Sequence, residues 1–308
     1  MGRKAFNVQG INQKVDLSIL REKQVALSVK REDLIHPFIS GNKYRKLKYN
    51  ILEAKQRGLD TLLTFGGAYS NHIAATAYAG KLYGIETIGV IRGEELEQNW
   101  MQNPTLLKAH EHGMNFKFVS RTAYREKADR SFLEGLERDF GPHYMIPEGG
   151  TNLLAVKGCE EILTQEDKGF KVICSSVGTG GTLAGIINSS LDDQRIIGFP
   201  SLKGGFLKKD IRNFTAKENW KINTDYHFGG YAKVSEGLIK FINNFREKTN
   251  IPTDPIYTGK LLFGILELVK NDYFKPGTQI LAIHSGGLQG IEGMNLVLKR
   301  KNLPLIEV

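Results

Sequence analysis

The chain has 308 residues, 41% hydrophobic and 24% charged, which is typical of a soluble globular protein of about two domains. No run of about 18 apolar residues occurs, so the sequence predicts no membrane span. Residues 1–13 lack the apolar segment and the small-residue cleavage site of a secretory signal, and we therefore expect a cytoplasmic protein that does not bind membranes.

The net charge is +9, from 42 basic and 33 acidic side chains. Basic residues are scattered along the chain and no basic stripe alternates with aromatic side chains, so nucleic acid binding is not expected. A basic balance modestly favours anionic small molecules as ligands. Cys159 and Cys174 lie far apart and predict neither a disulfide framework nor a zinc site, and we expect both thiols to be reduced and buried, with no metal bound.

Short apolar segments alternate with longer amphipathic ones along the chain. The expected strands are Thr61–Phe65, Thr87–Ile91, Phe116–Val119, Tyr144–Ile146, Lys171–Ser175, Arg195–Phe199 and Gln279–His284. The expected helices are Tyr44–Arg57, Asn71–Tyr83, Trp100–His112, Tyr124–Phe140, Leu153–Thr164, Thr182–Leu191, Ser235–Lys248, Gly259–Asn271 and Leu288–Leu298. Strands that alternate with helices predict an α/β protein with parallel sheets covered by helices.

No repeat, low-complexity segment or Gly/Ser linker marks a domain boundary. We expect two sheets, one with the strands near 61–65, 87–91, 116–119 and 144–146, and the other with the N-terminal segment and the strands near 171–175, 195–199 and 279–284. Right-handed crossovers place the C-terminal strand ends on one edge, so the cleft between the sheets is the expected site. The expected architecture is two open-sheet, three-layer αβα domains: a small domain of residues 48–147, and a large domain of residues 1–47 and 148–308.

The segment Ser40–Leu47 is the first that could carry chemistry. Gly41 supplies backbone freedom and Asn42 is a good helix cap, so a helix is expected to begin here. Lys43 then has its amine near the positive end of the helix dipole, which disfavours the charged form and makes it a candidate Schiff-base former. On these residues alone, a solvated surface lysine is the commoner explanation.

The predicted strand at Thr61–Phe65 ends in the turn Gly66–His72. Its two glycines allow a tight turn, and Ser70 or Asn71 is expected to cap the next helix. Free backbone N–H groups at such a helix start suit a carboxylate or another anion, although an ordinary capped turn has the same sequence.

The turn Gly178–Thr182 joins a strand to a helix and predicts a phosphate cradle of backbone N–H groups rather than a plain turn. It lacks the lysine of a Walker loop and the acidic residue of a dinucleotide fingerprint. The turn His284–Gly287 permits close approach of a flat ligand, with a plain strand-to-helix turn as the alternative. In Asp254–Lys260, Tyr257 precedes a helix, where a tyrosine usually packs but can act as a general acid.

Together these segments resemble one family, in order and spacing, over most of the chain. They are Lys30–Asp33, Gly41–Lys43, Gly66–His72, Gly178–Thr182, Asp254–Lys260 and His284–Gly287. The chain resembles the pyridoxal-phosphate (PLP) enzymes of the tryptophan synthase β fold, fold type II, in the branch of 1-aminocyclopropane-1-carboxylate deaminase and D-cysteine desulfhydrase. The resemblance implies a tryptophan synthase β-like PLP fold, PLP as the cofactor, a small amino-acid substrate and a homodimer.

The resemblance also implies a role for individual residues. Lys43 matches the lysine that forms the Schiff base with PLP and later moves the Cα proton, and Asn71 matches the residue that hydrogen-bonds the pyridine 3′-oxygen. The other cofactor-binding residues that it implies are Lys46, Gly178, Thr179, Gly180, Gly181, Thr182, Thr258 and Ser285.

On the substrate side, Ser70, Asn71 and His72 match the turn that holds the carboxylate. Ser70 also matches a serine that assists catalysis, and Tyr257 and Tyr231 match two active-site tyrosines. Retention of Lys43, Ser70 and Tyr257 is therefore expected of an active enzyme.

Two positions depart from the deaminase pattern and match the desulfhydrase branch. Where cyclopropane deaminases have a glutamate at the pyridine nitrogen the chain has Thr258, and where they have a leucine before the Gly-Gly pair of the last strand it has Ser285. A carboxylate keeps the ring nitrogen protonated and the ring strongly electron-withdrawing, whereas a hydroxyl only donates a hydrogen bond to an unprotonated nitrogen. The weaker sink suits loss of a Cα proton and of hydrosulfide better than opening of an unactivated cyclopropane.

The sequence thus predicts a PLP-dependent carbon–sulfur lyase that converts D-cysteine to pyruvate, hydrogen sulfide and ammonia. The alternatives are cyclopropane deamination to 2-oxobutanoate and ammonia, β-elimination or racemisation of another small D-amino acid, and a catalytically silent PLP-binding or metabolite-sensing protein. The hand of the substrate is left open. The segment Ser201–Lys221 matches the family poorly, and Gly204–Phe206 within it has no assigned role.

Overall fold

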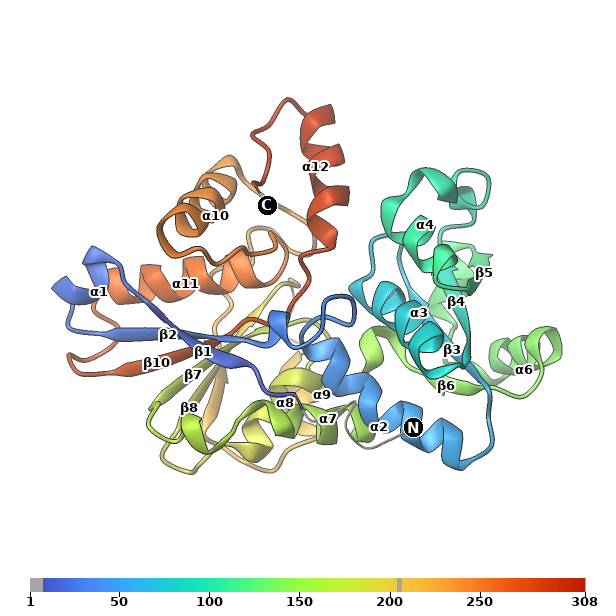
Figure 1. Cartoon of the computed structure of the whole chain (residues 1–308), viewed down its shortest axis with the longest axis horizontal. Coiled ribbons are helices and arrows are strands. Elements are labelled where there is room, and N and C mark those ends of the chain that lie inside the picture. Colours follow the sequence, from blue (N-terminus) through green and yellow to red (C-terminus); the bar gives the residue numbers. More distant parts are fainter. Residues whose placement is uncertain (1–7, 204–206, 308) are drawn as a thin grey trace.

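The computed structural model of the chain describes residues 8–203 and 207–307, so Gly204–Phe206 lies outside the described residues. Two β-sheets, each flanked by helices, lie side by side (Figure 1). The described strands of the larger sheet are, in spatial order, β1 (Ile11–Val15), β2 (Ala26–Arg31), β10 (Gln279–Ile283), β7 (Val172–Val177), β8 (Arg195–Pro200) and β9 (Trp220–Ile222). Neighbours are parallel except β1 and β2, which pair antiparallel.

The smaller sheet is parallel throughout. Its described strands, in spatial order, are β5 (Met114–Val119), β4 (Glu86–Arg92), β3 (Thr61–Gly66) and β6 (Tyr144–Ile146). The predicted division of the strands between two sheets is therefore confirmed, and the N-terminal segment joins the larger sheet as β1 and β2. The short strand β9 was not predicted. The domain boundaries after residues 47 and 147 stay predictions.

The longer helices are, in chain order, α2 (Asn42–Gln56), α3 (Asn71–Tyr83), α4 (Pro104–Glu111), α6 (Arg130–Phe140), α7 (Leu153–Cys159), α8 (Gly181–Ser189), α10 (Glu236–Thr249), α11 (Thr258–Lys270) and α12 (Gly290–Arg300). Three shorter helices are α1 (Ser18–Glu22), α5 (Arg121–Arg125) and α9 (Leu207–Arg212). Among the described residues, none of the helices combines the length and the apolar character that crossing a bilayer requires.

Both sheets are covered on both faces, because successive side chains of a strand point in opposite directions. In β7, Val172 and Cys174 pack against α11, whereas Ile173 between them packs against α7 and α8. In β3, Leu62 packs against the face covered by α2 and α3, whereas Leu63 packs against the opposite face, which α5 and α6 cover. The two three-layer αβα units are therefore as predicted, and Cys159 and Cys174 are free and buried as expected.

Three predicted helices differ from the observed ones. The helix expected over Leu153–Thr164 ends at Cys159, and a short 3-10 helix over Glu160–Ile162 follows it. The other two differ for local reasons. The helix expected from Trp100 begins at Pro104, where the side chain of Asn103 caps it by accepting from the N–H groups of residues 105 and 106. The helix expected over Tyr124–Phe140 is two helices, because Asp129 has an extended backbone and starts α6 anew.

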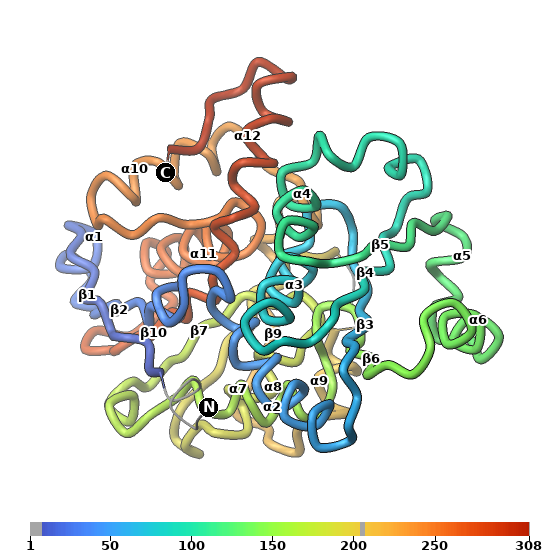
Figure 2. Tube along the Cα trace, turned by 45° about the vertical axis from the view of Figure 1, so that its right-hand side comes forward, coloured from blue at the N-terminus to red at the C-terminus, as the bar shows by residue number. Residues whose placement is uncertain are grey.

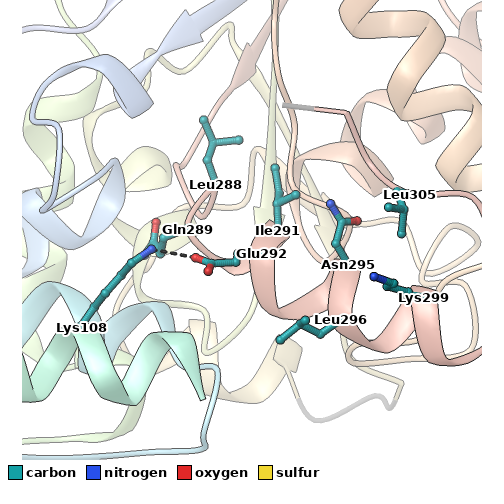
Figure 3. A pocket seen from close by; sticks show the side chains of 9 residues that line it. All are labelled: Lys108, Leu288, Gln289, Ile291, Glu292, Asn295, Leu296, Lys299 and Leu305. Carbon is teal, nitrogen blue, oxygen red and sulfur yellow. Dashed lines mark hydrogen bonds and ion pairs between the residues drawn. The ribbon is translucent and has the colours of Figure 1, made fainter. Parts of the chain in front are cut away.

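Helix α2 connects the two halves of the molecule. It contacts α7 beside the larger sheet and α3 beside the smaller one, and Figure 2 shows it alongside α7. A second contact between the halves lies at a surface groove of about 480 Å³ between α4 and α12 (Figure 3). Lys108 of α4 and Glu292 of α12 form an ion pair of 2.7 Å across it. The two halves are therefore in contact through α2 and also through α4 and α12.

Candidate active site

The N-terminus of α2 packs against the His284–Gly287 turn, which follows β10. Gly41 has φ of 61°, and a methyl group on it would lie 2.0 Å from the Ser285 carbonyl oxygen, so only glycine fits. The backbone N–H of Asn42 donates to the same oxygen at 3.2 Å. The prediction that Asn42 caps α2 is wrong: Gly41 is the cap, and the Asn42 amide donates instead to the Thr182 hydroxyl at 2.8 Å. Two predicted turns therefore meet at the start of α2.

Lys43 and Lys46 lie one helical turn apart and point at one carbonyl group. Both Nζ atoms lie 3.0 Å from the Gly149 oxygen, and Lys46 also donates to the Thr151 hydroxyl at 2.9 Å. In the described part of the chain neither amine is paired with a carboxylate. Lys43 is therefore not the solvated surface lysine that its position alone suggested.

Burial controls the charge of these amines. It lowers the pKa of Lys43 well below the usual value, and the neighbouring Lys46 lowers it further. Burial also lowers the pKa of Lys46 to about 8. Cys159 offers no counter-charge near neutral pH, because burial raises the pKa of its thiol to about 11. Lys43 can thus hold a neutral amine at neutral pH, as a nucleophile or base must.

The Gly178–Thr182 turn lies between β7 and the start of α8, as predicted. Gly180 has φ of 85°, and a methyl group on it would lie 2.9 Å from the Ile211 side chain of α9. The poorly matching segment Ser201–Lys221 therefore contributes a helix that packs under this turn. A methyl group on Gly181 would lie 2.8 Å from the Thr151 side chain. The turn is held from two sides and leads into the start of α8, where first-turn N–H groups without intrahelical acceptors favour an anion.

The turn 148–151, after β6, was missed by the sequence analysis. Gly149 and Gly150 have φ of 68° and 72°, and Gly149 supplies the carbonyl that binds both lysines. The Thr151 hydroxyl lies 2.5 Å from the Thr179 hydroxyl in the Gly178–Thr182 turn. A glycine pair soon after a predicted strand, separated from it by Pro147 and Glu148, was the available signal, and similar glycines identified the other turns.

Helix α3 presents its N-terminus to the site. Ser70 caps it, since its hydroxyl oxygen accepts from the Ile73 N–H at 3.3 Å, and the capping prediction is confirmed. The Asn71 Oδ1 atom is buried without a hydrogen-bond partner among the described residues. A methyl group on Gly287 would lie 2.9 Å from Asn71 Nδ2, so the turn after the last strand lies directly over this amide. Turns from both sheets therefore meet here.

His72 follows on the same helix, but its side chain is directed to the smaller sheet. Its Nε2 lies 2.8 Å from the Thr64 hydroxyl, which is 2.8 Å from the Ile146 carbonyl oxygen. Contact with a substrate carboxylate is open to its backbone N–H, which lies in the first turn where no intrahelical acceptor exists.

The two predicted tyrosines, Tyr257 and Tyr231, lie next to each other, beside the Gly178–Thr182 turn. The rings of Tyr257 and Tyr231 are 6.3 Å apart, and a methyl group on Gly178 would lie 3.3 Å from the Tyr257 ring. Burial, then Tyr231 and Asp254, raise the pKa of Tyr257 well above its usual value, so the phenol keeps its proton and can donate it. Tyr231 is 43% exposed and lies at the rim.

In the structure, the hydroxyl of Thr258 is already hydrogen-bonded within the protein. The residue is fully buried, and its hydroxyl donates to Asp254 Oδ1 at 2.7 Å and accepts from the Asp254 N–H at 3.0 Å. The Asp254 carboxylate also accepts from the backbone N–H groups of residues 256–258. The Thr258 proton is therefore already used, and its contact with a cofactor stays a prediction. Ser285 is 9% exposed, with its hydroxyl 3.2 Å from that of Ser176.

These residues fit PLP by their chemistry. Two buried amines without carboxylate partners, next to a glycine-rich helix start, suit an anionic phosphate, with Lys46 and the Gly178–Thr182 turn as its ligands. Lys43, the amine with the more strongly lowered pKa, suits an aldehyde. The unpartnered amide oxygen atom of Asn71 marks a polar group that a ligand can satisfy once the amide is suitably turned.

Comparison with known proteins identifies the family. Residues 9–286 match the family described as pyridoxal-phosphate dependent enzyme. A Pyrococcus abyssi protein with the provisional name 1-aminocyclopropane-1-carboxylate deaminase is 31% identical over 89% of this chain and 88% of its own. The bifunctional D-cysteine desulfhydrase/1-aminocyclopropane-1-carboxylate deaminase of Arabidopsis thaliana is 29% identical over 86% of this chain and 73% of its own.

A D-cysteine desulfhydrase of Serratia proteamaculans is 25% identical over 84% of this chain and 86% of its own. Among solved structures, a deaminase homologue superposes with a TM-score of 0.80, 28% identity, and coverage of 96% of this chain and 95% of its own. The chain therefore belongs to the pyridoxal-phosphate dependent enzymes, in the family of 1-aminocyclopropane-1-carboxylate deaminase and D-cysteine desulfhydrase.

Proposed function

We propose that this protein is a PLP-dependent lyase that releases hydrosulfide from D-cysteine, with pyruvate and ammonia as the final products. The observation that carries the proposal is that, within residues 8–203 and 207–307, the Thr258 hydroxyl is bonded to a carboxylate that is already compensated, and the Ser285 hydroxyl to that of Ser176. The nearby Asp254 carboxylate accepts four hydrogen bonds, three of them from backbone N–H groups at the start of α11, so its charge is compensated locally.

When bound, PLP supplies an electron-withdrawing ring that acidifies the substrate Cα–H bond. Lys43 would hold the cofactor and, when its amine is neutral, take the Cα proton onto Nζ. Lys46 and the Gly178–Thr182 turn would bind the phosphate. The start of α3, with Ser70 and Asn71, would bind the substrate carboxylate.

The leaving group decides between the possible substrates. Hydrosulfide leaves from Cβ with the electrons of the C–S bond, so the β-elimination needs only removal of a proton from Cα. A cyclopropane substrate has no Cα proton and needs more electron withdrawal. Uncharged hydroxyls at Thr258 and Ser285 suit the first reaction better.

Deamination of 1-aminocyclopropane-1-carboxylate is the second candidate, because relatives with 29% and 31% identity carry that name. It would yield 2-oxobutanoate and ammonia from the same site.

The purified protein tests both proposals. We expect an absorbance near ~420 nm that borohydride bleaches, and its loss in Lys43→Ala. We also expect sulfide and pyruvate from D-cysteine, with less or no product from L-cysteine and the cyclopropane acid. Lack of the absorbance would contradict cofactor binding, whereas a bound cofactor without sulfide release would contradict only the substrate.

We further propose that the protein is a cytoplasmic homodimer with domains of residues 48–147 and of 1–47 plus 148–308. The dimer is supported by family resemblance, and light scattering coupled to size-exclusion chromatography measures it.

A further inference from the structure

His72 carries a buried nitrogen atom to which the proposed function assigns no task. The side chain is 1% exposed, and Nδ1 has no hydrogen-bond partner within residues 8–203 and 207–307. Leaving a buried polar atom unpaired is unfavourable, so such an atom calls for an explanation, often a ligand or a group that moves.

Thr64 determines which nitrogen of this imidazole carries the proton. The Thr64 hydroxyl lies 2.8 Å from both the Ile146 carbonyl oxygen and His72 Nε2. A carbonyl oxygen only accepts, so the hydroxyl proton goes to Ile146 and the hydroxyl oxygen accepts from Nε2–H. Nδ1 then carries a lone pair, because burial and the nearby lysines lower the pKa of His72 well below its usual value and keep the ring neutral.

The imidazole lies against the turn that binds Lys43. A methyl group on Gly150 would lie 2.9 Å from His72 Cε1 and 3.2 Å from Nδ1. The preceding residue, Gly149, supplies the carbonyl oxygen 3.0 Å from Lys43 Nζ. One turn thus has two hydrogen-bond acceptors beside it, and only the carbonyl is in use.

We propose that His72 is a positioning residue for the amine of Lys43, an inference that rests on the proposed function. A neutral lysine amine has two N–H bonds and one lone pair. If Gly149 accepts one N–H bond and His72 Nδ1 the other, the lone pair of Nζ stays free for an aldehyde or a Cα proton.

Lys46 has less need of this acceptor, because two of its N–H bonds already go to Gly149 and Thr151. A substrate carboxylate cannot use Nδ1, since both groups are acceptors. Lys43 is one of the two lysines that lower the pKa of His72, which puts its amine near the ring, and its long, flexible stem leaves the amine free to turn.

The test is the rate at which the full-length protein, stripped of cofactor, captures added PLP on Lys43. Capture joins Nζ to the aldehyde carbon with loss of water, and the absorbance near ~420 nm follows it. His72→Leu removes the acceptor, and His72→Asn keeps nearly the same shape with an oxygen that can replace Nδ1. Thr64→Val removes the hydroxyl that selects the tautomer.

Thr76→Val is the matched control. Thr76 lies one turn further along α3, is fully buried, and its hydroxyl has no hydrogen-bond partner among the described residues. We expect capture about tenfold slower in His72→Leu and Thr64→Val, which corresponds to one lost hydrogen bond, and near-normal capture in His72→Asn and Thr76→Val.

A second readout needs no cofactor. Limiting acetic anhydride acetylates lysines in proportion to their reactivity, and peptide mass spectrometry compares Lys43 with the exposed Lys168. The Lys43/Lys168 ratio should fall about tenfold in His72→Leu and recover in His72→Asn. Equal values for the Leu and Asn variants would overturn the proposal, as would a change confined to the KM for the amino acid. If the wild type captured no PLP, the proposed function would fail, and the acetylation ratio would still decide the role of His72.

Discussion

In the proposed site, Lys46 is the residue whose charge should control anion binding. Its pKa of about 8 means that the free protein carries this charge below pH 8 and loses it above. Since an ammonium attracts phosphate and a neutral amine does so only weakly, PLP affinity should fall as the pH rises through about 8. We expect this in a Lys43→Ala background, where no covalent bond contributes, and equilibrium dialysis between pH 7 and pH 9 measures it.

Lys46→Met should weaken binding by about tenfold to a hundredfold at pH 7 and remove this component of the pH dependence. Lys48→Met is the control on the same helix, because Lys48 is paired with Glu161. An unchanged pH profile in Lys46→Met would contradict the assignment of Lys46 to the phosphate.

At the scale of elements, α7 packs against the backbone of α2 next to both lysines. A methyl group on Gly158 would lie 2.0 Å from the Arg45 carbonyl oxygen. Backbone atoms cannot give way as a flexible side chain does, so Gly158→Ala should push α2 aside and lower the free energy of unfolding by about 1–3 kcal/mol. Urea denaturation measures this, and PLP affinity should fall with it because α2 carries Lys43 and Lys46.

Gly135→Ala is the matched control within a helix. A methyl group there would meet nothing closer than the end of the Arg138 side chain at 3.8 Å. Because alanine loses less backbone entropy than glycine, we expect α6 and the protein to gain about 0.5–1 kcal/mol. If both substitutions had the same effect, close packing of α7 on α2 would not be what holds the first turn of α2.

At the scale of the whole molecule, the ion pair between Lys108 and Glu292 joins α4 of the smaller-sheet half to α12 (Figure 3). Both side chains are more than half exposed, at 58% and 56%, so water and salt weaken their attraction. Lys108→Met should therefore change the free energy of unfolding by less than about 1 kcal/mol. It should, however, speed hydrogen exchange in α4 and α12, because the pair links two elements far apart in sequence.

Arg130→Met breaks an exposed pair with Glu134 inside α6 and serves as the control. Its effect on exchange should stay within α6. A loss of stability above about 2 kcal/mol in Lys108→Met would mean that the contact is far stronger than its exposure allows.

Much of the architecture could be predicted from the sequence, because strand and helix periodicity depends on neighbours in the chain. The seven strands that were predicted all form, in the two expected sheets. The short strand β9 was not predicted, because three residues carry too little periodic signal and its pairing with β8 is a tertiary contact. The helix expected over Tyr124–Phe140 missed the break at Asp129, where backbone conformation outweighs the apolar pattern.

In the candidate site, the sequence identified residues with a local signal, but it did not identify the hydrogen-bond partners of their side chains. Local sequence was enough to single out Lys43 at a helix start, Ser70 as a cap, and the Gly178–Thr182 turn as a glycine-rich loop. Asn42 looked like a cap, but the distant Thr182 hydroxyl binds its side chain. Thr258 looked like a free donor, but the partner of its hydroxyl is Asp254, four residues earlier.

By itself, the sequence determined the alternation of strands and helices and the residue types in each turn, because these depend on local backbone preferences and on order along the chain. Only the tertiary structure decided that Gly149 joins Lys43 to Lys46, and that Thr64 leaves His72 Nδ1 without a proton. Burial and hydrogen-bond partners come from segments that lie far apart in the sequence, such as Asn42 and Thr182, and they set which atoms carry protons.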